Sequence, residues 1–153
     1  MKAPFPTSDE LVRVLESDAD VQSKAFACQQ LAVTGNPDSI PALAVLLKDK
    51  QLSDYARSAL QLMGDPAAAE ALRKSLPDLT GRPLHGVMDS LGILRDAAAV
   101  PVLAQSASGT SDESAHAALA ALGKIASDEA VTALLAALGG RPKCGGMAPS
   151  MRR

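Results

Sequence analysis

The apolar positions of the chain recur in a fixed order. Four segments begin with a leucine, carry an apolar residue nine positions later, and reach a second leucine three positions after that. The leading leucines, which lie 29, 31 and 31 residues apart, are Leu31, Leu60, Leu91 and Leu122. The second leucines are Leu43, Leu72, Leu103 and Leu134. Because self-similarity at a fixed period is typical of repeat proteins, we interpret each segment as the joint between stacked units.

Each unit has room for two helices, and capping residues mark where the first one begins. Asn36-Pro37 and Asp65-Pro66 are typical start signals, because Asn and Asp can cap free N–H groups and proline suits the first helical turn. The spacing of apolar residues in "IPALAVLL" predicts one helical face, and no stretch alternates long enough to predict a strand. First helices are expected near residues 8–17, 37–48, 66–76, 97–107 and 128–138. Second helices are expected near residues 19–34, 52–63, 80–94 and 112–126.

Composition and charge agree with packed helices and narrow the class of protein. Aromatic residues make up only 2% of the chain, and the net charge of −2 lacks the basic excess typical of nucleic-acid binders. No run of 18 apolar residues predicts a membrane span, and residues 1–10 lack the apolar core of a secretory signal. Two cysteines form no disulfide framework, so we expect a cytoplasmic protein. Cys28 is expected to be buried, whereas Cys144 lies in a glycine-rich tail.

The units resemble short bacterial HEAT-like repeats, of the kind also found in phycobiliprotein lyases. The matching signature, "AxxALxxLGxI" followed by a turn and "xAVPxL", is clearest in "AALAALGKIASDEAVTALLAAL" and "SLGILRDAAAVPVL". The resemblance covers roughly residues 10–138 and implies an all-α fold, a right-handed α-solenoid of about four and a half helix-hairpin repeats. The expected organisation is an N-terminal extension over 1–7, a single HEAT-like repeat domain over 8–139, and a flexible C-terminal tail over 140–153.

The second helices of the units are expected to line the concave face of this solenoid. Positions nine, six and two before each leading leucine share one side of these helices and form a predicted polar strip. The strip is a candidate site for a protein or peptide, although it has no aromatic anchor, and a solvated face without a ligand is the alternative. Its candidate residues are Gln22, Gln29, Asp54, Ser58, Arg82, His85, Asp89, Glu113 and His116, and Ala25 shares the column of the two histidines.

The sequence contains no catalytic motif of the GxSxG, phosphate-loop, HExxH or CxxC type, so we expect no enzymatic activity. His85 and His116 hold equivalent places in adjacent units, and Asp54 or Asp89 could add a third metal ligand. Zinc sites normally show tighter ligand spacing, so two exposed imidazoles are the favoured interpretation, and no metal or cofactor is expected. His85 and Asp89 could also be an acid–base pair, but any helix face with this spacing gives the same signal.

The last predicted helix begins a fifth unit whose second helix does not follow. Its sequence, "DEAVTALLAALGG", is apolar at nearly every position, whereas terminal repeats usually carry a polar outer face. Either the tail folds over this helix or another chain does, and a third possibility is that the chain is a segment of a longer repeat protein. The residues predicted for a homodimer contact are Val131, Leu134, Leu135 and Leu138.

These observations favour a non-enzymatic interaction or scaffold module with an unknown protein or peptide partner. The family resemblance alone suggests an alternative, an accessory subunit of a phycobiliprotein-lyase-like system. That role would favour a chromophore pocket with aromatic or thiol groups, for which the sequence offers Cys28 and Cys144. Weak nucleic-acid binding is a second alternative, since Arg57, Arg82 and Lys124 fall on or near the second helices. Acidic residues on the same helices reduce the net positive charge of that surface, which weakens this alternative. No membrane partner is expected.

Overall fold

The computed structural model describes residues 5–139, and every regular element within this range is helical. The α-helices are α1 (Ser8–Glu16), α2 (Val21–Thr34), α3 (Ile40–Leu46), α4 (Ser53–Met63), α5 (Pro66–Ser75), α6 (Gly81–Ile93), α7 (Val100–Ala107), α8 (Asp112–Ile125) and α9 (Asp128–Gly139). Short 3-10 turns lie at Pro37–Ser39, Leu76–Asp78 and Ala97–Ala99. All nine predicted helical intervals are therefore confirmed, while the predicted tail and most of the predicted N-terminal extension lie outside the described residues.

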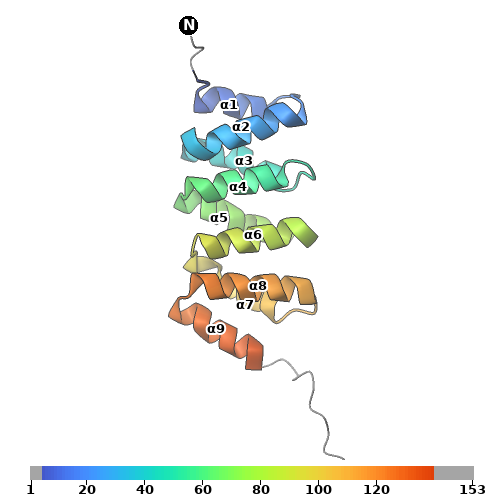
Figure 1. Cartoon of the computed structure of the whole chain (residues 1–153), viewed down its shortest axis with the longest axis vertical. Helices are drawn as coiled ribbons and strands as arrows, with labels where there is room; N and C mark the ends of the chain where they lie inside the picture. Colours follow the sequence, from blue (N-terminus) through green and yellow to red (C-terminus); the bar gives the residue numbers. More distant parts are fainter. Residues whose placement is uncertain (1–4, 140–153) are drawn as a thin grey trace, which may run out of the picture.

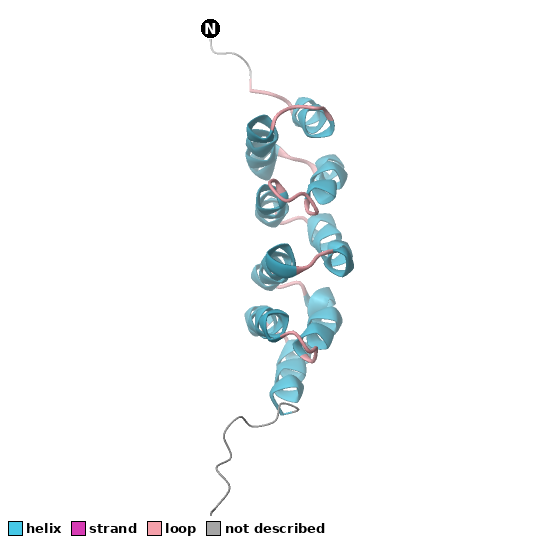
Figure 2. Ribbon diagram, turned by 90° about the vertical axis from the view of Figure 1, so that its right-hand side faces the viewer, coloured by secondary structure: helices cyan, strands magenta, loops and turns pink. Residues whose placement is uncertain are grey.

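The helices form two layers in an elongated stack, with α1 at one end and α9 at the other (Figures 1 and 2). We call α2, α4, α6 and α8 the even layer, and α1, α3, α5, α7 and α9 the odd layer. Each even helix packs against the next even helix along the stack, and the odd helices connect them. This arrangement is consistent with an α-solenoid, in which each unit contacts only its neighbours. No helix among residues 5–139 combines the length and apolar character needed to cross a membrane.

Local capping explains where most of these helices begin. The Asp65 carboxylate accepts a hydrogen bond from the backbone N–H of Ala67 (2.7 Å), as its position before Pro66 predicts. The prediction for Asn36 is wrong, because its side chain makes no capping hydrogen bond. The chain there enters a 3-10 turn instead, in which the Asn36 carbonyl accepts hydrogen bonds from the N–H and the hydroxyl of Ser39.

The two leucine columns form the centre of the core. The four leading leucines are at most 1% exposed, and the first three second leucines are fully buried. Leu134 is only partly covered, because it lies in the terminal helix α9. Cys28 is buried as predicted, and this burial raises the pKa of its thiol to about 11. The repeat register read from the leucines is therefore confirmed in the packing.

Candidate binding surface

Contacts between successive even helices define which side of each helix faces outward. On α6, Ser90 faces back toward α4, while Gly92 lies against Ala121 of α8. The exposed side of the even layer lies between these two contact surfaces. It carries the positions nine, six, five and two before the leading leucine, and the position two after it. We call this side the even face.

The predicted polar strip lies on the even face, but most of its charged members bridge neighbouring helices. Asp54 Oδ2 of α4 lies 3.4 Å from Arg82 Nη2 of α6, and Asp89 of α6 forms an ion pair with Lys124 of α8. His85 Nε2 of α6 is 3.0 Å from Ser114 Oγ of α8. These side chains therefore connect adjacent repeats, which prediction from a single helix could not show.

The other strip residues differ in their exposure. Gln22, Gln29 and Glu113 are exposed, and Ser58 is half-buried. His116 is exposed, and its Nδ1 lies 2.7 Å from the Asp112 carbonyl within its own helix. Ala25, which shares the column of the two histidines, is buried and is not part of an open strip. The strip thus becomes continuous only from α4 onward.

The two histidines do not form the sites considered from the sequence. His85 is hydrogen-bonded to Ser114, while the nearby Asp89 is paired with Lys124, so the two residues do not form the acid–base pair considered as an alternative. Within residues 5–139, no group of three His, Cys, Asp or Glu side chains is placed to hold a metal ion. The thiol of Cys28 is buried and holds its proton at neutral pH, so it is not a nucleophile there. Cys144 lies outside the described residues.

A polar network centred on the buried hydroxyl of Ser90, which sequence analysis does not predict, connects α4 to α6. Arg57 Nη1 donates a hydrogen bond to Ser90 Oγ (2.9 Å), and Ser90 Oγ donates one to Gln61 Oε1 (2.8 Å). Ser90 is fully buried, and the Arg57 guanidinium passes over Gly86, where a Cβ would lie only 3.0 Å from Arg57 Nε. The members are up to 33 residues apart, so no local spacing in the sequence reveals them.

Removing the hydroxyl at the centre of this network should weaken the fold. We expect Ser90→Ala to lower the free energy of unfolding by about 1–3 kcal/mol, because Arg57 and Gln61 would each lose a buried partner. Urea denaturation followed by circular dichroism measures the change. Ser58→Ala is the matched control on the preceding even helix, where a half-buried serine should cost less than about 0.5 kcal/mol. Equal effects of the two substitutions would contradict this assignment.

The even face also carries exposed apolar side chains that belong to none of the predicted sites. Two positions after the leading leucine, Val33, Leu62 and Ile93 are 86%, 68% and 48% exposed. They occupy equivalent places on α2, α4 and α6, and Lys124 ends the series on α8. We call these three residues the aliphatic column. The column makes a row of exposed apolar side chains along three successive repeats.

Two aromatic residues, each five positions before a leading leucine and outside the predicted strip, extend this apolar surface. Phe26 is 53% exposed and Tyr55 is 41% exposed. Each lies seven residues before a member of the aliphatic column, a spacing of about two helical turns that places both on the same side of the helix. Prediction missed them because it considered only polar positions on this face.

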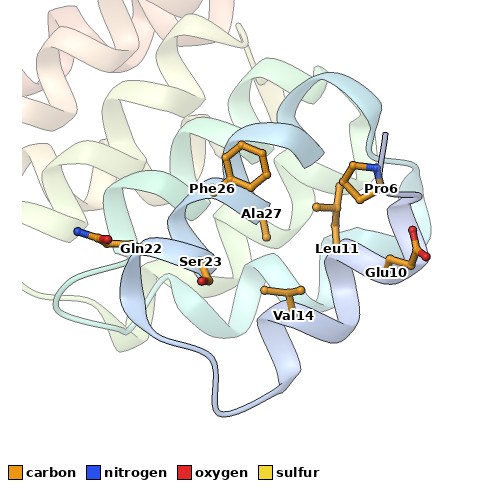
Figure 3. Close-up of a pocket in the computed structure, with 8 residues that line it drawn as sticks. All are labelled: Pro6, Glu10, Leu11, Val14, Gln22, Ser23, Phe26 and Ala27. Atoms are coloured by element: carbon orange, nitrogen blue, oxygen red, sulfur yellow. The ribbon is translucent and has the colours of Figure 1, made fainter. Parts of the chain in front are cut away.

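Phe26 also borders a groove of about 670 Å³ at the α1 end of the stack. Figure 3 shows the residues of α1 that face those of α2 across this groove. Its apolar lining is Pro6, Leu11, Val14, Phe26 and Ala27, and its polar lining is Glu10, Gln22 and Ser23. The groove lies on the side of α2 that, in later even helices, contacts the preceding even helix. The apolar surface of the even face thus continues around Phe26 to the end of the stack.

A second groove lies in the odd layer, between α3 and α5. It has a volume of about 620 Å³, and its exposed large apolar residue is Val45 (73%). Charged residues border it, and Lys74 is paired with Glu70 across one turn of α5 (2.6 Å). Unlike the even face, this groove spans two helices and has no row of exposed apolar residues along the stack.

Sequence comparison gives one match to a known family. The family model described as PBS lyase HEAT-like repeat matches residues 114–140, a segment that includes most of α8 and all of α9. This match supports a HEAT-like repeat protein, in agreement with the leucine columns. A comparison with curated proteins finds no match.

Proposed function

We propose that this HEAT-like repeat protein is a non-enzymatic scaffold that binds an apolar segment of a partner protein along the even face. The single observation that carries the proposal is the aliphatic column, three exposed residues in one repeat position on α2, α4 and α6. Equivalent positions on packed helices lie about 8–10 Å apart. That interval is close to two turns of an α-helix, so a partner helix with apolar residues seven apart fits the column.

The charges of the even face support an apolar partner over a nucleic acid. Arg82 is paired with Asp54, and Lys124 is paired with Asp89, so these cations face carboxylates of the same surface. Arg57 is half-buried in the network with Ser90. A nucleic-acid site needs unpaired cations that replace counterions along a phosphate backbone. Exposed apolar side chains that lie side by side are instead typical of a surface that binds a protein.

We take the stack to be a right-handed solenoid of about four and a half helix-hairpin units, with the even face on its concave side. This face offers repeated positions to one ligand. We place this function in the cytoplasm. Cys28, buried and protonated, offers no support for the alternative of an accessory subunit that handles a chromophore through a thiol.

Affinity capture with matched variants tests this proposal. The test variant combines Val33→Asp, Leu62→Asp and Ile93→Asp, which place charges on exposed positions and leave the core unchanged. The control is Val45→Asp, an equally exposed apolar residue of the odd layer. Quantitative mass spectrometry should find a protein held by the wild type and the control, with about tenfold or greater loss on the triple variant. A partner that is held equally by the triple variant, or lost only on Val45→Asp, would refute the proposal.

A further inference from the structure

The last helix, α9, keeps the core pattern of the odd layer but leaves it uncovered. In the column three positions before the second leucine, Ile40, Ala69 and Val100 are at most 9% exposed, whereas Val131 is 46% exposed. In the column four positions after that leucine, the equivalents of Leu138 are at most 5% exposed, whereas Leu138 is 53% exposed. Residues that are buried in each preceding repeat are therefore open to solvent in α9.

The neighbouring helix α8 is also uncovered, on the side that in α6 packs against the next even helix. Gly92 of α6 and Gly123 of α8 hold the same repeat position, one residue after the leading leucine. A Cβ on Gly92 would lie 2.9 Å from Ala121 Cα, because α8 packs closely there. A Cβ on Gly123 would meet no described atom within 4 Å. Ala120 and Gly123, three residues apart on one side of α8, are thus small residues that are exposed to solvent.

The C-terminal end of the described stack thus leaves one side of α8 and of α9 uncovered, where each preceding repeat packs a further helix. We call this uncovered surface of α8 and α9 the slot. Its apolar side chains are Val131, Leu135 and Leu138, spaced four and three residues apart on one side of α9. Leu134 differs from the prediction, because it packs against the core. From Ala130 to Gly139 the helix carries no charge that would oppose the approach of an apolar surface.

We propose that a second copy of this chain fills the slot, with the α9 helices of two copies packed antiparallel about a twofold axis. The surface is self-complementary, because it combines exposed apolar side chains on α9 with small residues on α8. Twofold pairing of one surface with itself is the commonest form of protein oligomer. The sequence that follows α9, residues 140–153, contains two prolines, three glycines and no Leu, Ile, Val or Phe, so its composition does not predict an apolar helix that would match this surface.

Head-to-tail stacking, in which the α1 end of one copy packs on the α9 end of another, fits the exposed surfaces less well than the twofold pair. The described stack has an odd helix at both ends, α1 and α9, so a head-to-tail contact would bring two odd helices together without an even helix between them. The slot beside α8 would then stay open. Pairing of two α9 helices instead gives each copy a helix in that slot.

Light scattering over a range of protein concentrations tests the proposal on the full chain. The expected mass is twice the chain mass of 15.7 kDa for the wild type. Leu135→Asp should raise the dimer dissociation constant about tenfold or more, because it places a charge in the centre of the contact. Val33→Asp, at an exposed valine far from α9, should remain dimeric. A monomeric wild type, or a dimer that Leu135→Asp leaves intact, would overturn the proposal.

Disulfide trapping distinguishes the twofold contact from other arrangements. Leu135 lies near the middle of the exposed stripe, so in an antiparallel pair it faces its own counterpart close to the axis. Leu135→Cys, in a Cys144→Ser background, should form a covalent dimer on mild oxidation, while buried Cys28 does not react. Masses that grow beyond the dimer without this cross-link would indicate head-to-tail stacking and overturn the proposal.

The chain's own tail is an alternative occupant of the slot, and truncation tests it. A chain that ends at Gly139 should dimerise as the full chain does. If only the shortened chain dimerises, the tail covers α9 and the proposal is wrong. The result is independent of the proposed function, since Leu135→Asp should still bind the partner and the triple variant of the aliphatic column should still dimerise.

Discussion

Leu91→Ala is expected to lower the free energy of unfolding by about 2–5 kcal/mol. Leu91 is fully buried at the joint between α6 and the turn that precedes α7, in the middle of the stack. Truncation to alanine removes apolar contacts and leaves a cavity, because helices held on both sides cannot close the space completely. Since each unit contacts only its neighbours, a defect at this joint also uncouples the two halves of the stack.

Urea denaturation followed by circular dichroism measures this effect, with Ile93→Ala as the matched control. Ile93 lies two residues further along the same helix and is 48% exposed, so its truncation should cost about 1 kcal/mol or less. If Leu91→Ala unfolded at the same urea concentration as the wild type, the repeat register described above would be incorrect.

Alanine at two equivalent glycines is expected to change stability in opposite directions. Gly92→Ala should destabilise by about 1–3 kcal/mol, because the new methyl group would lie 2.9 Å from Ala121 Cα and 3.1 Å from the Ala121 carbonyl oxygen. Both of these atoms belong to the backbone, so α6 and α8 would have to move apart. Gly123→Ala should stabilise by up to about 1 kcal/mol, because alanine favours the helix and no described atom lies in its way.

Both glycine variants are best made in the Leu135→Asp background, so that association of two copies does not contribute to the measured stability. Thermal or urea unfolding then compares the same chemical change at the same repeat position, once inside the stack and once at its end. Stabilisation by both substitutions would contradict the close approach of α6 and α8. Destabilisation by both would contradict the open face of α8.

The repetition of the leucines was sufficient to predict the helices and the core. Leu31 and its three equivalents recur at nearly constant spacing, and the packing that buries them depends on the same contacts in every unit. The start signal at Asp65 acts within three residues, so it could also be read from the sequence. Asn36 shows the limit of such signals, because a 3-10 turn satisfies the same groups in another way.

The binding surface was predicted less well, for two physical reasons. Contacts such as Asp89 with Lys124, and Arg57 with Ser90, join residues more than 30 positions apart, and their pairing depends on how the helices are stacked. Exposure of apolar residues is the second reason. Leu62 has the apolar side chain typical of a core residue. Only the direction of that side chain relative to α2 and α6 leaves it 68% exposed.

We infer that a partner protein binds the even face along the aliphatic column. Photo-crosslinking tests it most directly, with a photoreactive amino acid placed at Leu62 in one variant and at Val45 of the odd layer in another. Both positions are exposed, so either variant should fold. We expect a crosslinked partner protein from position 62 and none from position 45. Adducts of equal yield from both positions, or from position 45 alone, would contradict the account.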